Sequence, residues 1–250
     1  MRAARLFIIL FLCSFLSHGK QIEVCGSCPI TSISEAIVQA EDGDEILVKS
    51  GVYKEHGILV NKSVSIHGEG LPLVDGELKE TIFRITADHV SLSGLEIVNV
   101  GQSYTKDFAA ILVSHSDGFI IENNIFKQVF FGILIEKSKN GIIRNNRVSS
   151  NAVSQSNSGN GIHLWHCSKM EVSHNELTGL RDGIYFEFVK ESKVFENLSY
   201  SNLRYGLHFM FSNNNAYHDN VFRNNGAGVA IMFSKFVKMY DNRFEHTWGT

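Results

Sequence analysis

Five short stretches in the second half of the chain share one alternating pattern of apolar and polar positions. Each begins with a glycine, and the first and third residues after it are apolar; the glycines are Gly132, Gly161, Gly183, Gly206 and Gly228. A period of two residues is typical of a β-strand with one buried face. A second short strand is predicted before a recurring asparagine, as in residues 193–196, and a third after it, as in residues 221–223.

The asparagines and glycines form two columns with the same spacing. The asparagines are 22, 29, 22, 23 and 22 residues apart, and they are Asn124, Asn146, Asn175, Asn197, Asn220 and Asn242. The glycine column has the same long interval of 29 residues, which contains the polar stretch 150–158. This interval predicts an inserted loop of about seven residues in a repeat of about 22 residues.

Three short strands in each coil of about 22 residues predict an all-β fold. We expect a single-stranded, right-handed parallel β-helix of the pectin-lyase-like type, because sequential parallel connections are almost always right-handed. Stacked coils would bring the asparagines into register, where their amides could hydrogen-bond along the column. We expect these asparagines to occupy left-handed backbone conformations at the corners, which asparagine tolerates well.

The two ends of the repeat region differ. Ser32 to Glu35 form a capping-box pattern, and Ile33, Ile37 and Ala40 supply an apolar stripe, so a short N-terminal helix is predicted to cover the first coil. Residues 242–250 stop inside a coil. We therefore expect the β-helix to span residues 20–250 and its C-terminal coils to be missing.

The N-terminal residues have the pattern of a secretory signal peptide. Arg2 and Arg5 precede an apolar run of 11 residues, and Ser17 and Gly19 are small residues suited to cleavage after Gly19. A membrane anchor is the alternative, but a span requires about 20 apolar residues. The predicted signal peptide is 1–19, and the predicted location is the periplasm.

Export changes the interpretation of the cysteines. Cys13 would be removed with the signal peptide, whereas Cys25 and Cys28 form a C-G-S-C motif in the mature chain. In an oxidising compartment this pair predicts a local disulfide. The alternative is a soft-metal site, because paired thiolates suit Cu(I). Cys167 aligns with a column of serines, which favours a buried structural cysteine.

Composition and net charge exclude one class of function. The 250 residues are 44% hydrophobic and 20% charged, as expected of an ordinary folded protein. A formal net charge of −3 provides no basic field, so a nucleic-acid partner is excluded.

The outward positions of the glycine-led strands bring three copper-type ligands together. His208 lies two residues after its glycine, and Met210 and Met232 lie four residues after theirs. Imidazole and thioether groups are ligands for Cu(I), so this solvent-facing patch is a copper candidate. The alternative is an apolar strip that packs on another protein. His163 and His166 are expected to be surface histidines, and Arg181 and Arg204 to solvate the coil edge.

Many β-helices act on polysaccharides, which requires two carboxylates that face one bond. The candidates are Asp219 and Asp241 with Glu196, and a weaker pair, Asp182 and Glu187. The first three lie singly at turns, so we expect no enzymatic activity. A carbohydrate-active secreted β-helix remains the alternative function.

Three segments resemble successive coils of the NosD family: residues 181–187 (RDGIYFE), 203–212 (LRYGLHFMFS) and 225–234 (NGAGVAIMFS). The resemblance covers the mature chain, and R-Y-G-x-H-x-M is its specific part. It implies a non-catalytic periplasmic accessory protein for maturation of the copper-sulfur centre of nitrous-oxide reductase. The implied partners are the membrane subunit of an ABC transporter, a copper chaperone and the reductase. Direct copper binding is left open.

Overall fold

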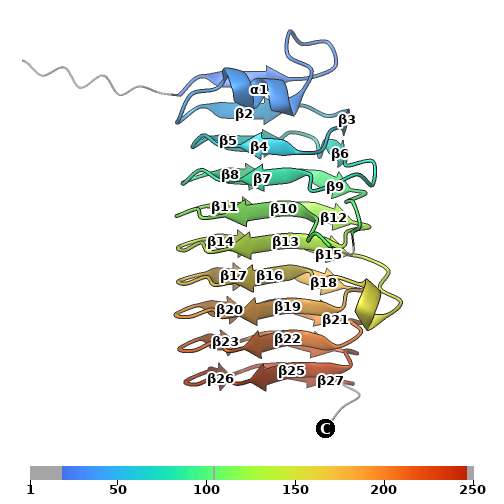
Figure 1. The fold of residues 1–250 in the computed structure, drawn as a ribbon, viewed down its shortest axis with the longest axis vertical. Coiled ribbons are helices and arrows are strands. Elements are labelled where there is room, and N and C mark those ends of the chain that lie inside the picture. The colour runs from blue at the N-terminus through green and yellow to red at the C-terminus, as the bar shows by residue number, and fades with distance from the viewer. Residues whose placement is uncertain (1–18, 104, 247–250) are drawn as a thin grey trace, which may run out of the picture.

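The structure is a computed structural model that describes residues 19–103 and 105–246. The predicted signal peptide therefore lies outside the described residues, apart from Gly19, as do the last four residues of the chain. The described chain forms a parallel β-helix of stacked coils (Figure 1), which confirms the predicted fold class. None of the described helices has the length and apolar character needed to cross a membrane.

Each complete coil contributes one strand to each of three parallel sheets, which we call A, B and C; the first coil has a strand in sheet A alone, and the last described coil has strands in sheets A and B. Sheet A contains β1 (Gln21–Val24), β2 (Glu45–Val48), β5 (Ser65–Gly68), β8 (Ser91–Ser93), β11 (Ile120–Glu122), β14 (Ile142–Arg144), β17 (Glu171–Ser173), β20 (Lys193–Phe195), β23 (Ala216–His218) and β26 (Lys238–Tyr240). Sheet B contains β3 (Val52–Lys54), β6 (Leu73–Asp75), β9 (Glu96–Val98), β12 (Ile125–Lys127), β15 (Arg147–Ser149), β18 (Glu176–Thr178), β21 (Leu198–Tyr200), β24 (Val221–Arg223) and β27 (Arg243–Glu245). Sheet C contains β4 (Ile58–Val60), β7 (Phe83–Ile85), β10 (Ala109–Ser114), β13 (Phe131–Glu136), β16 (Ile162–Trp165), β19 (Asp182–Glu187), β22 (Tyr205–Met210) and β25 (Ala227–Met232).

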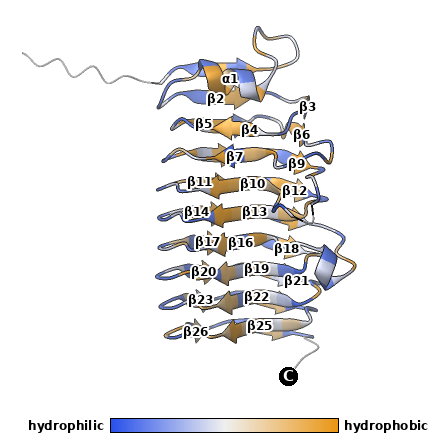
Figure 2. Cartoon of the chain, viewed as in Figure 1, coloured by the Kyte–Doolittle hydropathy of each residue, from blue (hydrophilic) through white to orange (hydrophobic). Residues whose placement is uncertain are grey.

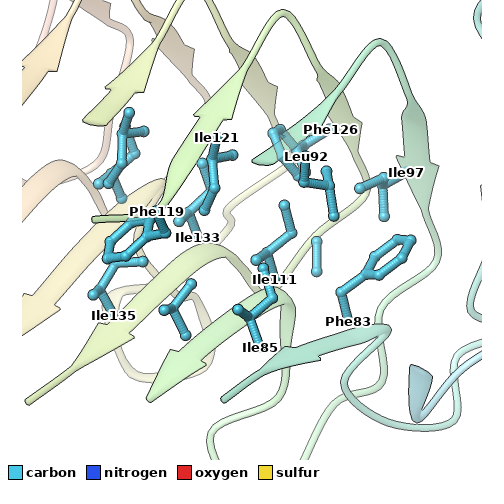
Figure 3. Close-up of a cluster of buried hydrophobic side chains, with 14 of the residues drawn as sticks. Phe83, Ile85, Leu92, Ile97, Ile111, Phe119, Ile121, Phe126, Ile133 and Ile135 are labelled. Atoms are coloured by element: carbon cyan, nitrogen blue, oxygen red, sulfur yellow. The ribbon is translucent and has the colours of Figure 1, made fainter. Parts of the chain in front are cut away.

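The apolar positions of all three sheets meet inside the coils. Figure 3 shows side chains from neighbouring strands, among them Phe83, Ile111 and Ile133, that point into one shared interior. Residues of the glycine-led strands such as Ile184 and Phe186 are fully buried there. The hydropathy colouring in Figure 2 shows apolar residues on strands throughout the stack. Burial of apolar surface between adjacent coils is thus the main stabilising term.

The glycine column exists because the inward position at that point is already filled. A Cβ on Gly183 would lie 2.1 Å from Oγ of Ser199, and one on Gly206 would lie 2.6 Å from a ring carbon of Phe222. Neither glycine has a positive φ. Close packing, and not an unusual turn conformation, therefore explains the recurring glycine.

The asparagine column forms a buried hydrogen-bonded ladder. The backbone N–H and the Nδ2 of Asn175 both donate to Oδ1 of Asn197, at 2.9 and 3.0 Å. Asn197 repeats the pattern with Asn220, at 3.0 and 2.9 Å. Each amide thus satisfies backbone groups at a buried corner.

The prediction that these asparagines have left-handed backbone conformations was wrong. The left-handed residue is the one before each ladder asparagine, and these residues are Asn123, Asn145, His174, Glu196, Asp219 and Asp241. The ladder asparagines themselves are not among the residues with positive φ, and their side chains bond to the neighbouring coil. A second ladder, which the sequence analysis missed, joins Asn202 to Asn225, each five residues after a ladder asparagine.

The predicted N-terminal helix is present as α1 (Ile33–Gln39). Ser32 accepts a hydrogen bond from the backbone N–H of Glu35, as a capping box requires. The carboxylate of Glu55 caps the same end, since it accepts from the backbone N–H groups of Ile33 and Ser34. The inserted stretch 150–158 leaves the regular coil and contains the short 3₁₀-helix η1 (Gln155–Asn157).

Candidate functional site

The outer face of sheet C carries the candidate ligands in the predicted register. Met210 of β22 pairs with Met232 of β25, and His208 pairs with Ala230. Along the preceding coils His208 follows Tyr185, which follows His163. The structure thus places His208, Met210 and Met232 on adjacent strands of one sheet face.

The expected exposure of His208 is corrected by the structure. Only 2% of His208 is exposed. The rings of Tyr185 and Tyr205 cover it, with centroids 4.6 and 4.9 Å from that of the imidazole. Met210 and Met232 are half-buried. The histidine therefore lies beneath the surface, and the two thioethers lie at its margin.

A buried ion pair fixes the position of His208. Nε of Arg204 donates to Oδ1 of Asp182 at 2.9 Å, and Nδ1 of His208 lies 3.4 Å from Oδ2 of the same carboxylate. The side chain of Asp182 is fully buried. Burial alone would raise the pKa of Asp182, but the hydrogen bonds of His208 and Arg204 outweigh it and lower that pKa below its ordinary value.

Neither Arg181 nor Arg204 is the fully solvated side chain at the coil edge that was expected. Arg204 also contacts Nδ1 of His208 at 3.3 Å, so it is part of the buried network. Arg181 is half-buried and donates from Nε to Oδ1 of Asn160 at 3.2 Å. Burial is the largest cause that lowers the pKa of Arg181.

Several buried nitrogen atoms on this face have no hydrogen-bond partner among the described residues. They are Nε2 of His208, both ring nitrogens of His163 and Nδ2 of Asn160. An unpaired buried polar atom costs about 1–3 kcal/mol. Such atoms mark places where a ligand, a partner or water can supply the missing contact.

Glu187 is the carboxylate that lies beside His163. Its Oε2 lies 3.9 Å from Nε2 of His163, which is too long for a direct hydrogen bond. The interaction with His163 is the first cause that lowers the pKa of Glu187. His163 itself is largely covered, and its ring lies 4.7 Å from that of Tyr185, so it is not the free surface histidine that was expected.

Histidine, cysteine and carboxylate groups alone do not form a metal centre here. No group of three or more such residues is placed to hold a metal ion within residues 19–103 and 105–246. Cys25 and Cys28 are joined in a disulfide, so neither offers a thiolate. Cys167 is buried, and burial raises the pKa of its thiol to about 11. A copper site on sheet C would therefore depend on the methionines.

The carboxylates considered for polysaccharide cleavage lie apart in two settings. Glu196, Asp219 and Asp241 occupy the left-handed positions of successive turns between sheets A and B. Asp182 is fully buried in its ion pair with Arg204 and has a lowered pKa, whereas a general acid needs a raised one. Asp182 is thus unsuited to donate a proton to a glycosidic oxygen.

Solved structures with the same architecture define the class of protein. The chain is similar to an exopolygalacturonase from Thermotoga maritima, with a TM-score of 0.66 and 13% identity over 86% of this chain and 72% of that one. It is also similar to PfbA, a surface adhesin of Streptococcus pneumoniae, with a TM-score of 0.71 and 13% identity over 85% of this chain and 67% of that one. At this identity the likeness shows the fold alone: a β-helix of the pectin-lyase-like class.

The sequence comparison identifies the family within that class. The model of the NosD family, described as a periplasmic copper-binding protein, matches residues 38–156 and 148–249. The chain therefore belongs to the NosD family. It is 27% identical over 127 residues to a probable ABC transporter binding protein NosD of Pseudomonas aeruginosa, which is 50% of this chain and 30% of that relative. For the protein of the same description from Stutzerimonas stutzeri, the identity is 26% over 154 residues, which is 61% of this chain and 35% of the relative. The matched stretches thus span about a third of each relative.

Proposed function

We propose that this protein is a periplasmic accessory factor for the maturation of the copper-sulfur centre of nitrous-oxide reductase. Membership of a family described as periplasmic and copper-binding supports this proposal. The membrane subunit of an ABC transporter is the first proposed partner, in keeping with the description of the two relatives. A copper chaperone and the reductase are the others. The proposed signal peptide, residues 1–19, would deliver the chain to the periplasm.

Copper is proposed as cargo that binds at His208, Met210 and Met232. The observation that carries this proposal is the unpaired, buried Nε2 of His208, which lies on the same face as a register pair of methionines. Imidazole with two thioethers is a donor set that favours Cu(I) over Zn²⁺ or Ca²⁺.

The buried network suits this role of His208. A metal at Nε2 requires the ring proton to be on Nδ1. In that tautomer Oδ2 of Asp182, 3.4 Å from Nδ1, accepts the proton, and the contact of Nδ1 with Arg204 at 3.3 Å is no longer a hydrogen bond, because arginine can only donate. Carboxylates that bind the far nitrogen of a ligating histidine set its tautomer and orientation. Asp182 is therefore proposed as a positioning residue for copper.

A Cu(I) titration against a competing chelator tests the proposal. We expect one Cu(I) per chain, and the double variant Met210→Leu/Met232→Leu should bind roughly tenfold or more weakly. Leucine keeps the volume of methionine but has no donor atom. In cells that make nitrous-oxide reductase, the same variant should lower the copper content of the enzyme.

Met239→Leu is the matched control, because Met239 is 58% exposed and lies on sheet A. This variant should bind Cu(I) as the unchanged protein does. Equal affinity of the double variant and the unchanged protein would contradict the copper site.

A role in polysaccharide chemistry is the alternative function, and an assay separates the two. We propose that the protein has no catalytic activity, and we expect no release of reducing ends from a panel of polysaccharides. Release that depends on Asp219 or Asp241 would revive the carbohydrate-active function.

A further inference from the structure

The turns that lead from sheet C into sheet A carry a row of stacked aromatic side chains. The first residues of successive turns are His166, Phe188, Phe211 and Phe233. Their ring centroids are 4.6, 5.1 and 5.1 Å apart, and the planes differ by only 8°, 8° and 15°. We call Phe188, Phe211 and Phe233 the aromatic ridge.

The backbone at the ridge disfavours phenylalanine. Phe188, Phe211 and Phe233 have φ values of 55°, 50° and 49°. Bulky residues are outliers in this left-handed region, where glycine, asparagine and aspartate are preferred. The same position holds His115 and Lys137 in earlier coils, so the fold itself does not require an aromatic residue there.

The ridge is also exposed. Phe188 and Phe211 each have a stacked ring on both sides, yet 41% and 43% of their surface remains accessible. Stacking thus covers the ring faces but leaves the edges pointing outward. Exposed apolar side chains grouped in this way mark an interaction surface.

Lysines flank the ridge. Lys169, Lys190 and Lys235 lie in the same turns and are exposed, and none forms an ion pair within 4.0 Å among the described residues. Lys193 and Lys238 begin the strands that follow two of these turns. Glu191 is the only acidic residue, and no arginine occurs, in the sequence of turns 166–170, 188–192, 211–215 and 233–237.

This combination favours a lipid surface over a protein partner. Protein–protein interfaces are depleted in lysine and enriched in arginine. Aromatic residues with lysines beside them are typical of proteins that lie on anionic membranes. The turns also stack along one outer edge of the molecule, at the left in Figure 1, where a flat surface can reach them.

We propose that the aromatic ridge is a membrane-contact surface. Phe188, Phe211 and Phe233 enter the boundary between lipid headgroups and acyl chains, and Lys169, Lys190 and Lys235 bind anionic headgroups. The proposal does not depend on copper binding or on the function proposed above. It gives the solenoid a defined side that faces the bilayer.

Co-sedimentation with vesicles tests the proposal. The purified full chain should bind vesicles of phosphatidylglycerol and phosphatidylethanolamine more tightly than vesicles of phosphatidylcholine, and salt should weaken this binding. The triple variant Phe188→Asn/Phe211→Asn/Phe233→Asn should lower the partition coefficient at least roughly tenfold. Its melting temperature should not fall, because asparagine's left-handed preference offsets the lost stacking.

Two further variants make the test specific. Leu78→Asn is the matched control. Leu78 is 65% exposed and has a φ of 57°, but it lies in the connection between β6 and β7, far from these turns. It should leave vesicle binding unchanged. Lys169→Gln/Lys190→Gln/Lys235→Gln should reduce binding roughly fivefold for each lysine and remove most of its salt dependence. This set keeps the test informative even if the asparagine variant fails to fold.

Three outcomes would overturn the proposal. One is equal binding of the unchanged protein to anionic and neutral vesicles. Another is unchanged binding by both triple variants. The third is a dimer in sedimentation velocity that the asparagine variant dissociates, because the ridge would then join two copies of the chain.

Discussion

At the scale of single residues, Asp182 organises the outer face of sheet C. Its buried carboxylate accepts from Arg204 and from the backbone N–H of Tyr205, and it lies beside the imidazole of His208. Removing one partner from a buried ion pair leaves an uncompensated charge, which costs about 3–5 kcal/mol. Asp182 therefore stabilises the fold and orients the proposed copper ligand with the same contacts.

The lowered pKa of Asp182 predicts how stability responds to acid. A folded-state pKa below the ordinary value means that the ionised carboxylate stabilises the fold above about pH 4, and that this contribution is lost as the pH falls through the folded-state pKa. Asp182→Asn should lower the free energy of unfolding by about 3 kcal/mol at neutral pH. The difference from the unchanged protein should shrink at about pH 3.

Urea unfolding at the two pH values measures this difference. Asp241→Asn is a suitable control, because Asp241 is exposed and forms no ion pair within 4.0 Å among the described residues. A gap between Asp182→Asn and the unchanged protein that stays constant with pH would contradict the role assigned to the ionised carboxylate.

At the scale of elements, the asparagine ladder connects successive coils at the corner between sheets A and B. Asn197 accepts from Asn175 and donates to Asn220 and to the carbonyl of Val172, and it is almost fully buried. Every rung thus satisfies groups of its own coil and of both neighbours. The ladder fixes the register that brings Met210 opposite Met232.

Asn197→Ala tests the ladder. The variant leaves several buried backbone groups without partners, so the free energy of unfolding should fall by about 3 kcal/mol or more. Asn151→Ala, in the exposed inserted loop, should change it by less than about 0.5 kcal/mol. Chemical denaturation of the two variants makes the comparison, and equal stability would show that the ladder contributes no more than a surface amide.

How much of these elements could be predicted depends on periodicity. The positions of Asn197 and Gly206 were predictable because both residues recur at the spacing of the coil. The backbone conformation was not, because a left-handed residue at Glu196 and one at Asn197 both satisfy the same spacing. The second ladder at Asn202 was missed because it has only two members, too few to stand out as a column.

At the scale of the whole molecule, each strand in residues 19–103 and 105–246 pairs only with strands of adjacent coils in its own sheet. The register of His208 and the methionines followed from the repeat and needed no further information. The burial of His208 did not, because Tyr205 covers it and the neighbouring coils have Asp182 and Ala227, not tyrosine, at that position. The exposed ridge at Phe188 and Phe211 likewise depends on which way the turns project.

A solenoid with only neighbour contacts should keep its two ends energetically independent. The Cys25–Cys28 disulfide follows β1 at one end, whereas β22 and β25 lie near the other (Figure 1). Cys25→Ser/Cys28→Ser should therefore lower the stability of the first coils by about 2 kcal/mol, the value for so short a loop. The Cu(I) affinity and stoichiometry should not change, because the proposed ligands lie in distant coils. Hydrogen exchange measures the first effect and the chelator titration the second. A loss of bound Cu(I) in the serine variant would instead assign copper to the C-G-S-C motif.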